Sequence, residues 1–386
     1  MTGSNQDKLT EIILKFYDQT AVLSSDSAKY IQLFQQMYSR FQIEKAVPSV
    51  YPPMKLHIQS GLYDGTAPRL ILDGVVTSLA GIELDDGYIY ENILNTIISR
   101  VRSHFLIHAG VISRHGQGIV LVADSAHGKT TLVLELLRRG FQFLSDEMAA
   151  LGREDRMVHP FPRSLRIRPG TLELTGFPQA GQDAPIWLDK YLLDIDRIKK
   201  DCLGPAVSIR HIVIFQNPAL KKMKRTIDDQ RKIMVVVDRV DDAFLDCIRE
   251  FKQVQNLQVD HSRTYPFLNI VASHTTTLLS QIEAQCVQRK ILLLNYQREE
   301  TSRPKFDALP RLRPMSKTDA VREMLRRFLG GHKSALLQAE FDGNSLRLYM
   351  ELAEIVKQAS CHQLSVGTLS EMADLVSGLL FSSKSE

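Results

Sequence analysis

The sequence predicts an α/β protein, and three observations within residues 105–151 predict it. A short apolar run is followed at once by a loop that contains glycine and lysine. That loop opens a leucine-rich stretch of helical length, and a second apolar run after it ends in two acidic residues. Strand, loop, helix and strand in this order are typical of α/β domains, whose ligands bind at the carboxyl ends of the strands.

The first strand of this unit is predicted at residues 119–122, which read Ile-Val-Leu-Val. A short continuous run of apolar and β-branched residues is typical of a strand that is buried on both faces. Residues 115–118, His-Gly-Gln-Gly, give the turn signal that separates it from an earlier apolar run. We therefore expect a tight turn and then a buried strand that ends at the loop.

The loop at residues 123–130 matches the phosphate-binding pattern G-x-x-x-x-G-K-S/T, except that Ala123 replaces the first glycine. In such a loop, backbone N–H groups and the positive end of the next helix face phosphate oxygens. Gly128 would allow close approach, Lys129 would neutralise the β- and γ-phosphates, and the Thr130 hydroxyl would be a ligand to Mg²⁺. ATP and Mg²⁺ are therefore the expected cofactors. The predicted nucleotide-binding residues are Ala123, Asp124, Ser125, Ala126, His127, Gly128, Lys129, Thr130 and Thr131.

A helix is predicted to follow the loop and to end at Arg138-Arg139-Gly140, because cations favour the last turn of a helix and glycine favours its stop. Residues 141–145 then predict the next strand, which brings Asp146 and Glu147 to the carboxyl end of the sheet. Both acids are expected to face the loop.

This segment resembles the catalytic domain of HPr kinase/phosphorylase and, more closely, the looser group of HPr-kinase-related proteins. The resemblance covers roughly residues 100–175. It implies a phosphoenolpyruvate-carboxykinase-like fold with a P-loop mixed-sheet kinase domain. The shared pattern is carried by His108, Asp124-Ser125, Gly128-Lys129-Thr130, Arg139-Gly140 and Asp146-Glu147.

The resemblance implies catalytic roles for Asp146, His108 and Lys129, with Asp146 accepting the proton of the substrate hydroxyl. It implies that Thr130, Glu147 and Asp146 hold the metal. The related enzymes follow the acid pair with Glu-Ile-Arg-Gly-Leu-Gly, whereas residues 166–170 here read Arg-Ile-Arg-Pro-Gly and lack the glutamate. This difference counts against the phosphorylase reaction. The candidates for a later catalytic arginine are Arg166, Arg168 and Arg263.

Composition excludes several classes of function. Apolar residues make up 44% of the chain and charged residues 24%, as in ordinary globular proteins, and the net charge is only +4. No basic block is interleaved with aromatics, so we expect no nucleic-acid partner. The 4 cysteines are far apart in sequence, which favours a reducing cytoplasm. The start of the chain lacks a signal-peptide pattern and no apolar run is long enough for a membrane span, so a cytoplasmic location away from the membrane is predicted.

Two domains are predicted, an N-terminal α+β lobe at residues 1–100 and a catalytic domain at 101–386 with helical and strand elaborations toward its C-terminus. In the lobe, helical spacing predicts a helix at 27–42, and we expect its aromatic stripe to pack in a core rather than form a peptide groove. The lobe is a candidate for substrate recognition. The stripe comprises Tyr30, Leu33, Phe34, Met37, Tyr38 and Phe41.

Beyond residue 151 the pattern is less regular. Residues 171–205 predict a surface excursion, either a lid or substrate loop or a plain loop. The basic run at 221–225 is typical of a solvated tip, with an acidic partner as the alternative. Helices are expected near 240–252, 275–287, 316–329 and 344–358, and capping-box spacings begin at Ser316 and Thr368.

The favoured function is an ATP-dependent kinase that transfers the γ-phosphoryl to a serine hydroxyl of a peptide or protein. One alternative is an ATPase or nucleotide switch that acts on a partner, but Asp146 and Glu147 follow Lys129 by only 17 and 18 positions, closer than in motor ATPases. A small-molecule kinase that acts on free serine is the other alternative. The resemblance also suggests a homo-oligomer.

Overall fold

The described chain divides into two compact units. The first unit comprises Met1–Ser78, Asp86–Gln216 and Lys305–Glu386, and the second comprises Leu79–Asp85 and Asn217–Pro304. The computed structural model describes residues 10–45, 51–60, 69–78, 86–124, 127–187, 190–216, 231–261, 266–273, 275–289, 291, 293–298, 308–331 and 334–381.

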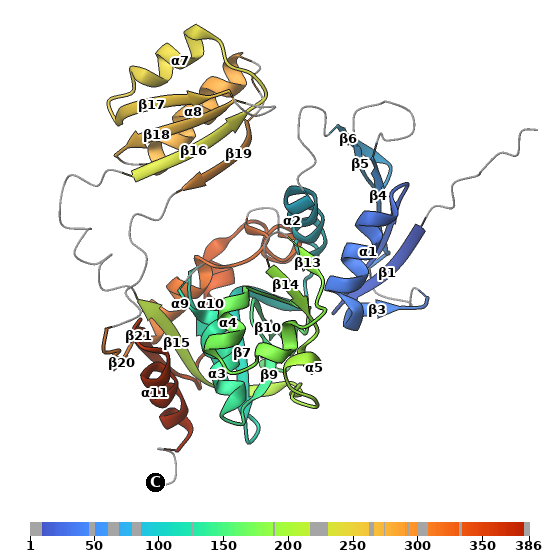
Figure 1. Ribbon diagram of the computed structural model, residues 1–386, viewed down its shortest axis with the longest axis vertical. Helices are drawn as coiled ribbons and strands as arrows, with labels where there is room; N and C mark the ends of the chain where they lie inside the picture. Colours follow the sequence, from blue (N-terminus) through green and yellow to red (C-terminus); the bar gives the residue numbers. More distant parts are fainter. Residues whose placement is uncertain are drawn as a thin grey trace, which may run out of the picture. The chain divides into compact units, whose positions relative to one another are not determined.

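The first unit is built on an eight-stranded mixed sheet with the order β11-β10-β7-β8-β15-β21-β20, in which β9 pairs with β7 (Figure 1). Strand β15 runs parallel to β8 and β21, whereas β7 runs antiparallel to β8. The mixed α/β class predicted from the sequence is confirmed. The strands are β7 (His104–Arg114), β8 (Gln117–Val122), β9 (Gln142–Ser145), β10 (Met148–Gly152), β11 (Met157–His159), β15 (Val207–Gln216), β20 (Leu312–Pro314) and β21 (Ser360–Ser365).

Helices cover both faces of this sheet, which explains why residues 119–122 of β8 are all apolar. Val120 and Val122 pack in one core with α9 and α10, while Ile119 and Leu121 pack in a second core with α3 and α11. Successive side chains of a strand point to opposite faces, so a strand covered on both sides needs no polar residue. The covering helices are α3 (Lys129–Arg138), α9 (Lys317–Leu325), the π-helical η4 (Leu336–Glu340), α10 (Ser345–Ile355) and α11 (Leu369–Phe381).

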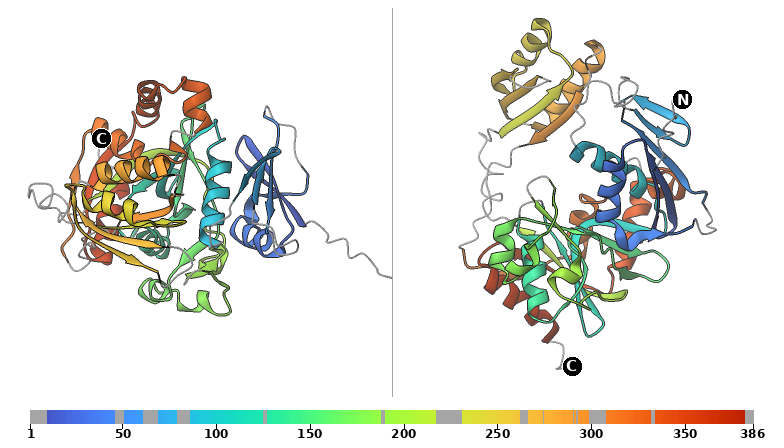
Figure 2. Two further views of the ribbon diagram at one scale, coloured as in Figure 1. Left: turned by 90° about the horizontal axis from the view of Figure 1, so that it is seen from above. Right: turned by 45° about the vertical axis from the view of Figure 1, so that its right-hand side comes forward.

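A second sheet of six strands, in the order β3-β1-β2-β4-β5-β6, precedes this core in the chain. Helix α1 lies along one face of it, as Figures 1 and 2 both show, and contacts β1 and β2. The elements are β1 (Thr10–Phe16), β2 (Gln19–Ser25), α1 (Ala28–Met37), η1 (Ser39–Phe41), β3 (Gln42–Ile43), β4 (Met54–Gln59), β5 (Arg69–Leu72), β6 (Val75–Ser78) and the following α2 (Asp86–Ile98).

The aromatic stripe of α1 and η1 packs in a core, as predicted. Five of its members are buried: Tyr30, Phe34, Met37, Tyr38 and Phe41. Leu33 is the exception, because it is only half-buried. The helix ends at Met37, earlier than predicted, and the last aromatic belongs to the short η1 turn.

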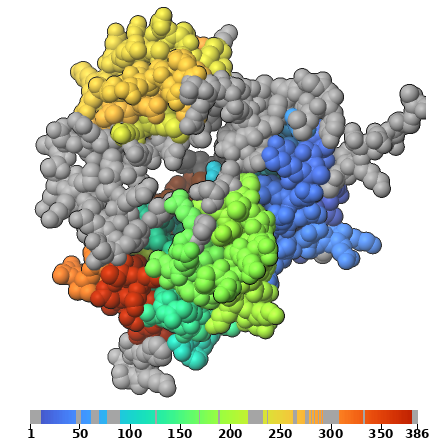
Figure 3. Space-filling model, in the orientation of Figure 1, coloured from blue at the N-terminus to red at the C-terminus, as the bar shows by residue number. Residues whose placement is uncertain are grey.

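The N-terminal sheet shares its core with the large sheet. The ring of Phe161 lies 4.7 Å from Phe41 and 5.8 Å from Phe16 between centroids. The backbone N–H of Ser164 donates to the carbonyl of Met37 at 2.8 Å. Figure 3 shows this N-terminal part (blue) against residues 151–205 (green). The aromatic face of the N-terminal lobe is therefore completed by residues beyond 150, and both belong to the first unit.

Residues 171–205 form short elements rather than one open excursion. Leu172, Leu193 and Ile195 are buried in the core beneath α3. Three short strands of this segment form a separate sheet in the order β12-β14-β13, in which β14 pairs with both β12 and β13. The elements are β12 (Leu165–Ile167), α4 (Pro169–Leu174), η2 (Pro178–Gly181), β13 (Ile186–Trp187), β14 (Lys190–Leu193) and α5 (Ile195–Ile198).

The second unit is a separate four-stranded antiparallel sheet that the sequence analysis did not recognise as a domain. Its β-α-β-β-α-β order and its strand order β17-β18-β16-β19 are those of a ferredoxin-like fold. Alternate residues Ile233, Val235 and Val237 pack under its helices. The basic run at 221–225 and Arg263 lie outside the described residues. The elements are β16 (Arg231–Val237), α7 (Asp242–Arg249), β17 (Val254–Asp260), β18 (Phe267–Ala272), α8 (Thr275–Arg289) and β19 (Leu293–Arg298).

Local signals placed most helices well. Ser316 accepts a hydrogen bond from the N–H of Asp319, so the predicted capping box starts α9.

In the part of the chain that the structure describes, no helix is both long and apolar enough to cross a membrane.

Replacing Phe161 with alanine should lower the free energy of unfolding of the first unit by about 3–5 kcal/mol, because a fully buried ring of a shared core is lost. Urea unfolding followed by fluorescence measures this, since Trp187 is the chain's 1 tryptophan and lies in that unit. Leu346→Ala, at a side chain that is 67% exposed, is the control and should stay within about 0.5 kcal/mol. A loss below about 1 kcal/mol for Phe161→Ala would contradict a shared core.

Candidate active site

The loop at 123–128 leads into α3 through a glycine that the backbone requires. Gly128 has φ of +80°, a left-handed conformation that side chains disfavour, and it is the N-cap of α3. Lys129 follows and is only 6% exposed. On the neighbouring strand β7, a Cβ on Gly110 would lie 3.3 Å from Lys129 Cγ, so glycine there lets α3 pack closely. Ser125 and Ala126 lie outside the described residues.

Lys129 at the start of α3 and His108 on β7 lie side by side. The Lys129 ammonium donates to His108 Nε2 at 2.7 Å. His108 Nδ1 lies 3.1 Å from Glu147 Oε1. Because an ammonium can only donate, Nε2 is the acceptor and Nδ1 carries the hydrogen that faces Glu147. The histidine thus links the lysine to the second acidic residue.

Asp146 and Glu147 occupy the turn between β9 and β10. The Ser145 hydroxyl accepts the N–H of Glu147 at 3.2 Å and so fixes this turn. Asp146 is 1% exposed and its Oδ2 accepts from the Thr130 hydroxyl at 3.3 Å. Its other oxygen, Oδ1, has no hydrogen-bond partner among the described residues. Both acids therefore lie against the start of α3.

Arg163 is a residue of the site that the sequence reasoning missed. Its Nη2 donates to Glu147 Oε2 at 3.0 Å, its Nε lies 3.9 Å from Asp146 Oδ1, and the side chain is 6% exposed. Its Nη1 donates to the hydroxyl of Tyr90 on α2 at 3.4 Å. Buried cations of this kind need paired carboxylates, and here two are present. A lone arginine between Pro162 and Ser164 gives no periodic signal that could have revealed this role.

The structure describes two of the three predicted arginine candidates, Arg166 and Arg168. The Arg166 guanidinium stacks over the ring of Trp187, 4.4 Å from its centroid. Arg168 is exposed and Arg263 is outside the described part.

Arg327 is a second unforeseen cation. Its Nη2 donates to Asp124 Oδ1 at 2.6 Å, and its carbonyl accepts the N–H of His108 at 2.8 Å. The backbone of Arg327, just after α9, therefore pairs with β7, and its guanidinium lies at the start of the loop that follows β8.

Burial and charge shift the pKa values at this site in different directions. Burial raises the pKa of Asp146, and the charge of Arg163 opposes it. Burial also acts to raise the pKa of Glu147, but Arg163 and the His108 hydrogen bond outweigh it and hold that pKa well below the usual range. Burial lowers the pKa of Lys129 to about 8, although Glu147 and Asp146 oppose the shift. The site thus holds one buried carboxyl group closer to neutrality and one firmly ionised.

The oxygen donors present suit Mg²⁺ in kind. The Thr130 hydroxyl and Asp146 Oδ2, which lie 3.3 Å apart, are hard oxygen ligands of the type that this ion prefers. The described residues contain no group of three or more His, Cys, Asp or Glu that could hold a metal alone. Magnesium usually keeps waters and takes substrate phosphates, so one or two protein oxygens are sufficient.

Comparisons with known proteins agree with the resemblance. No protein-family model matches the chain. Over 77 residues it is 27% identical to the HPr kinase/phosphorylase of Pediococcus pentosaceus, a match that covers 19% of this chain and 25% of that protein. The HPr(Ser) kinase/phosphatase from Coxiella burnetii aligns at 13% identity over 48% of this chain and 97% of that chain, with a TM-score of 0.21. The predicted resemblance to HPr-kinase-related proteins is thus confirmed for a segment that spans a quarter of the curated relative.

The pKa of Lys129 should be about 8 and should fall further in Glu147→Gln, because the Glu147 charge raises it. NMR of ¹³C-labelled lysine side chains during a pH titration measures this value. Glu354→Gln, at an exposed residue paired with Lys357, is the matched control and should leave the Lys129 titration unchanged. An unshifted pKa of 10.5 for Lys129 in the wild type would show that the ammonium is solvated rather than buried.

Proposed function

We propose that this chain is an ATP-dependent kinase that transfers the γ-phosphoryl to the serine hydroxyl of a peptide or protein. The observation that carries the proposal is the buried Asp146 carboxylate, whose Oδ1 accepts no hydrogen bond in the described structure and whose Oδ2 accepts from Thr130 at the start of α3. The resemblance to HPr-kinase-related proteins supports the same reaction class.

The nucleotide would bind at residues 123–131. The N–H groups at the start of α3 and the Lys129 ammonium would hold the β- and γ-phosphates, since helix N-termini and lysines favour anions. Arg327 adds a second cation at Asp124. His108 keeps Lys129 in place before the nucleotide binds.

Thr130 and Asp146 would hold the magnesium ion, which when bound neutralises charge on the β- and γ-phosphates. Glu147 was predicted as a further ligand. Its two oxygens already face His108 and Arg163, so we propose that it acts through water or by fixing these two side chains.

Asp146 would accept the proton of the attacking hydroxyl through Oδ1. A base works best when its pKa lies near the operating pH, and burial moves the pKa of Asp146 upward, toward that value. Arg163 keeps the carboxylate charged enough to act. Transfer therefore rests on positioning and electrostatics, as in other phosphoryl transfers.

Asp146→Asn should retain ATP binding but lose about 10²–10⁴-fold in transfer, the usual contribution of a general base. Binding is measured by calorimetry and transfer with γ-labelled ATP. Asp155→Asn is the matched control, because that carboxylate lies on the turn before β11 and pairs with His159. Full activity of Asp146→Asn would refute the assignment of the base.

Purified protein with Mg²⁺ and γ-labelled ATP, offered free serine, serine-containing peptides and a lysate from its own source, tests the reaction itself. Label should appear on a peptide or protein serine and be absent with Lys129→Ala, because the ammonium that holds the phosphates is gone. Label on free serine would make it a small-molecule kinase. Lys129-dependent release of free phosphate with no labelled acceptor would contradict the kinase proposal in favour of an ATPase switch.

A further inference from the structure

Two buried polar atoms of opposite charge face each other in the site without forming a hydrogen bond. Arg163 Nε lies 3.9 Å from Asp146 Oδ1, and neither atom has a hydrogen-bond partner among the described residues. An N–H···O bond needs about 2.7–3.2 Å between its heavy atoms, so a shift of roughly 1 Å would form one. Because an unsatisfied buried group costs free energy, the gap indicates that other contacts hold the guanidinium back.

The other two outer nitrogens of the Arg163 guanidinium are tied elsewhere. Nη2 donates to Glu147 Oε2 at 3.0 Å, and the second oxygen of that carboxylate lies 3.1 Å from His108 Nδ1. Nη1 donates to the hydroxyl of Tyr90 at 3.4 Å. A guanidinium is planar and rigid, so a movement of its Nε toward Asp146 disturbs these contacts.

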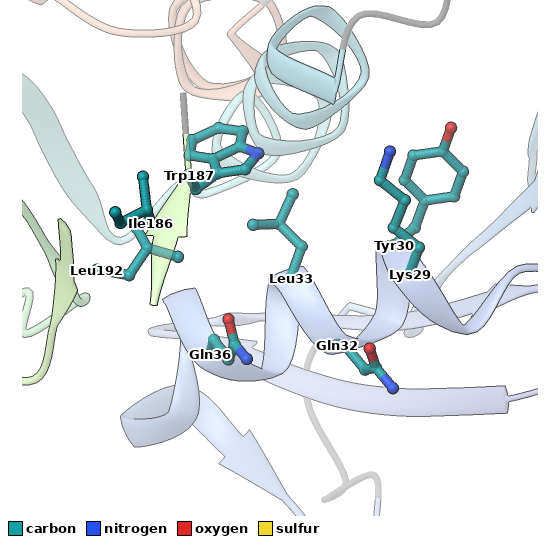
Figure 4. A pocket seen from close by; sticks show the side chains of 8 residues that line it. All are labelled: Lys29, Tyr30, Gln32, Leu33, Gln36, Ile186, Trp187 and Leu192. Atoms are coloured by element: carbon teal, nitrogen blue, oxygen red, sulfur yellow. The ribbon is translucent and has the colours of Figure 1, made fainter. Parts of the chain in front are cut away.

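Tyr90 is a neutral acceptor in a fixed position. Its side chain is 2% exposed, and its ring lies 5.5 Å from that of Phe34 and 5.0 Å from that of Trp187 between centroids. Trp187 also lines a small pocket beside α1 (Figure 4). The Tyr90 hydroxyl lies 2.5 Å from that of Tyr38. Because Arg163 can only donate, the hydrogen of Tyr90 is free to point at Tyr38, and a hydroxyl that donates in this way accepts more strongly.

The Tyr90 hydroxyl decides whether the gap to Asp146 stays open. With the hydroxyl present, a guanidinium that moved toward Asp146 would exchange one acceptor for another and gain little. Without it, Nη1 and Nε of Arg163 would both be buried donors that lack acceptors, and the carboxylate 3.9 Å away could satisfy one of them. Arg163 would then occupy Asp146 Oδ1, the oxygen that the proposed reaction needs for the substrate hydroxyl.

We propose that Tyr90 is a positioning residue of the transfer reaction, whose hydroxyl holds the Arg163 guanidinium away from Asp146 Oδ1 and keeps that oxygen available to the substrate. Its effect on transfer rests on the proposed kinase function, whereas the position of the guanidinium does not. Helix α2, which carries Tyr90 and precedes the segment at 105–151, thereby takes a direct part in the site.

NMR of the full-length protein labelled with ¹⁵N-arginine tests the position of the guanidinium without any substrate. In Tyr90→Phe the Nε–H proton signal of Arg163 should move downfield, because that N–H then donates to a carboxylate. Arg163→Lys, which has no Nε–H, identifies the signal by its loss. Tyr38→Phe keeps the Tyr90 hydroxyl but removes its support, so it should give a smaller shift in the same direction.

Tyr349→Phe is the matched control, since it makes the same change at a half-buried tyrosine of α10 that packs against another core. It should leave the Arg163 signal in place. An Arg163 signal at its wild-type position in Tyr90→Phe would overturn the proposal.

Transfer from γ-labelled ATP to serine-containing peptides tests the consequence for the reaction. Tyr90→Phe should lower kcat by about 10-fold or more, a part of the 10²–10⁴-fold that a general base contributes. The KM for ATP should not change, because Lys129 and the start of α3 are untouched. In an Arg163→Lys background the same substitution should have little further effect, since no guanidinium is left to move.

An unchanged kcat in Tyr90→Phe, or an equal loss in the Arg163→Lys background, would overturn the positioning role. A wild type that labels no peptide or protein would instead overturn the proposed kinase, and the role of Tyr90 in transfer with it. The NMR shift would still decide whether Tyr90 holds the guanidinium, so the two failures are distinguishable.

Discussion

The ion pair between Arg163 and Glu147 is the interaction on which the rest of the site depends. A guanidinium that is 6% exposed is stable only beside opposite charge, and removing it would leave the buried Asp146 beside Glu147 without their shared cation. The same guanidinium reaches the hydroxyl of Tyr90, which hydrogen-bonds to Tyr38 of the N-terminal lobe at 2.5 Å. One cation thus joins the turn of Asp146 and Glu147 to the aromatic core of the N-terminal lobe.

This arrangement prepares the site for chemistry before any ligand binds. Lys129, His108 and Glu147 form a continuous line of hydrogen bonds, so the lysine that would meet the phosphates is already oriented. Asp146 Oδ1 accepts no hydrogen bond within the described structure, although the charge of Arg163 lies 3.9 Å away, and such a buried group needs an explanation beyond folding. Groups fixed in advance in a site that excludes water act more strongly on developing charge than mobile ones would. The unsatisfied oxygen and the proposed base therefore belong to the same residue.

The elements of the site that are contiguous in sequence could be predicted from the sequence, but the contacts between distant residues could not. Strand β8, the loop, α3 and the acids after β9 are contiguous, and each has its own signal in pattern, cap or turn. Arg163 lies 16 positions from Glu147, and Arg327 lies 203 positions from Asp124, so only the folded topology brings them in. The second unit was missed for a similar reason, since its strands resemble those of the main sheet and only their pairing separates them.

The shared core also decides how the N-terminal lobe can be studied. Removing residues 1–95 would expose Phe161 and leave Arg163 without Tyr90, so loss of transfer in a truncated protein would report damage to the site as readily as loss of recognition. Substitutions on the outer side of α1 avoid this problem, because Leu33 is only half-buried and its side chain is not part of the buried aromatic face. If the lobe selects the acceptor, we expect the selection to operate through such positions, since the rest of its aromatic face packs against Phe161 and, through Tyr90, contacts Arg163.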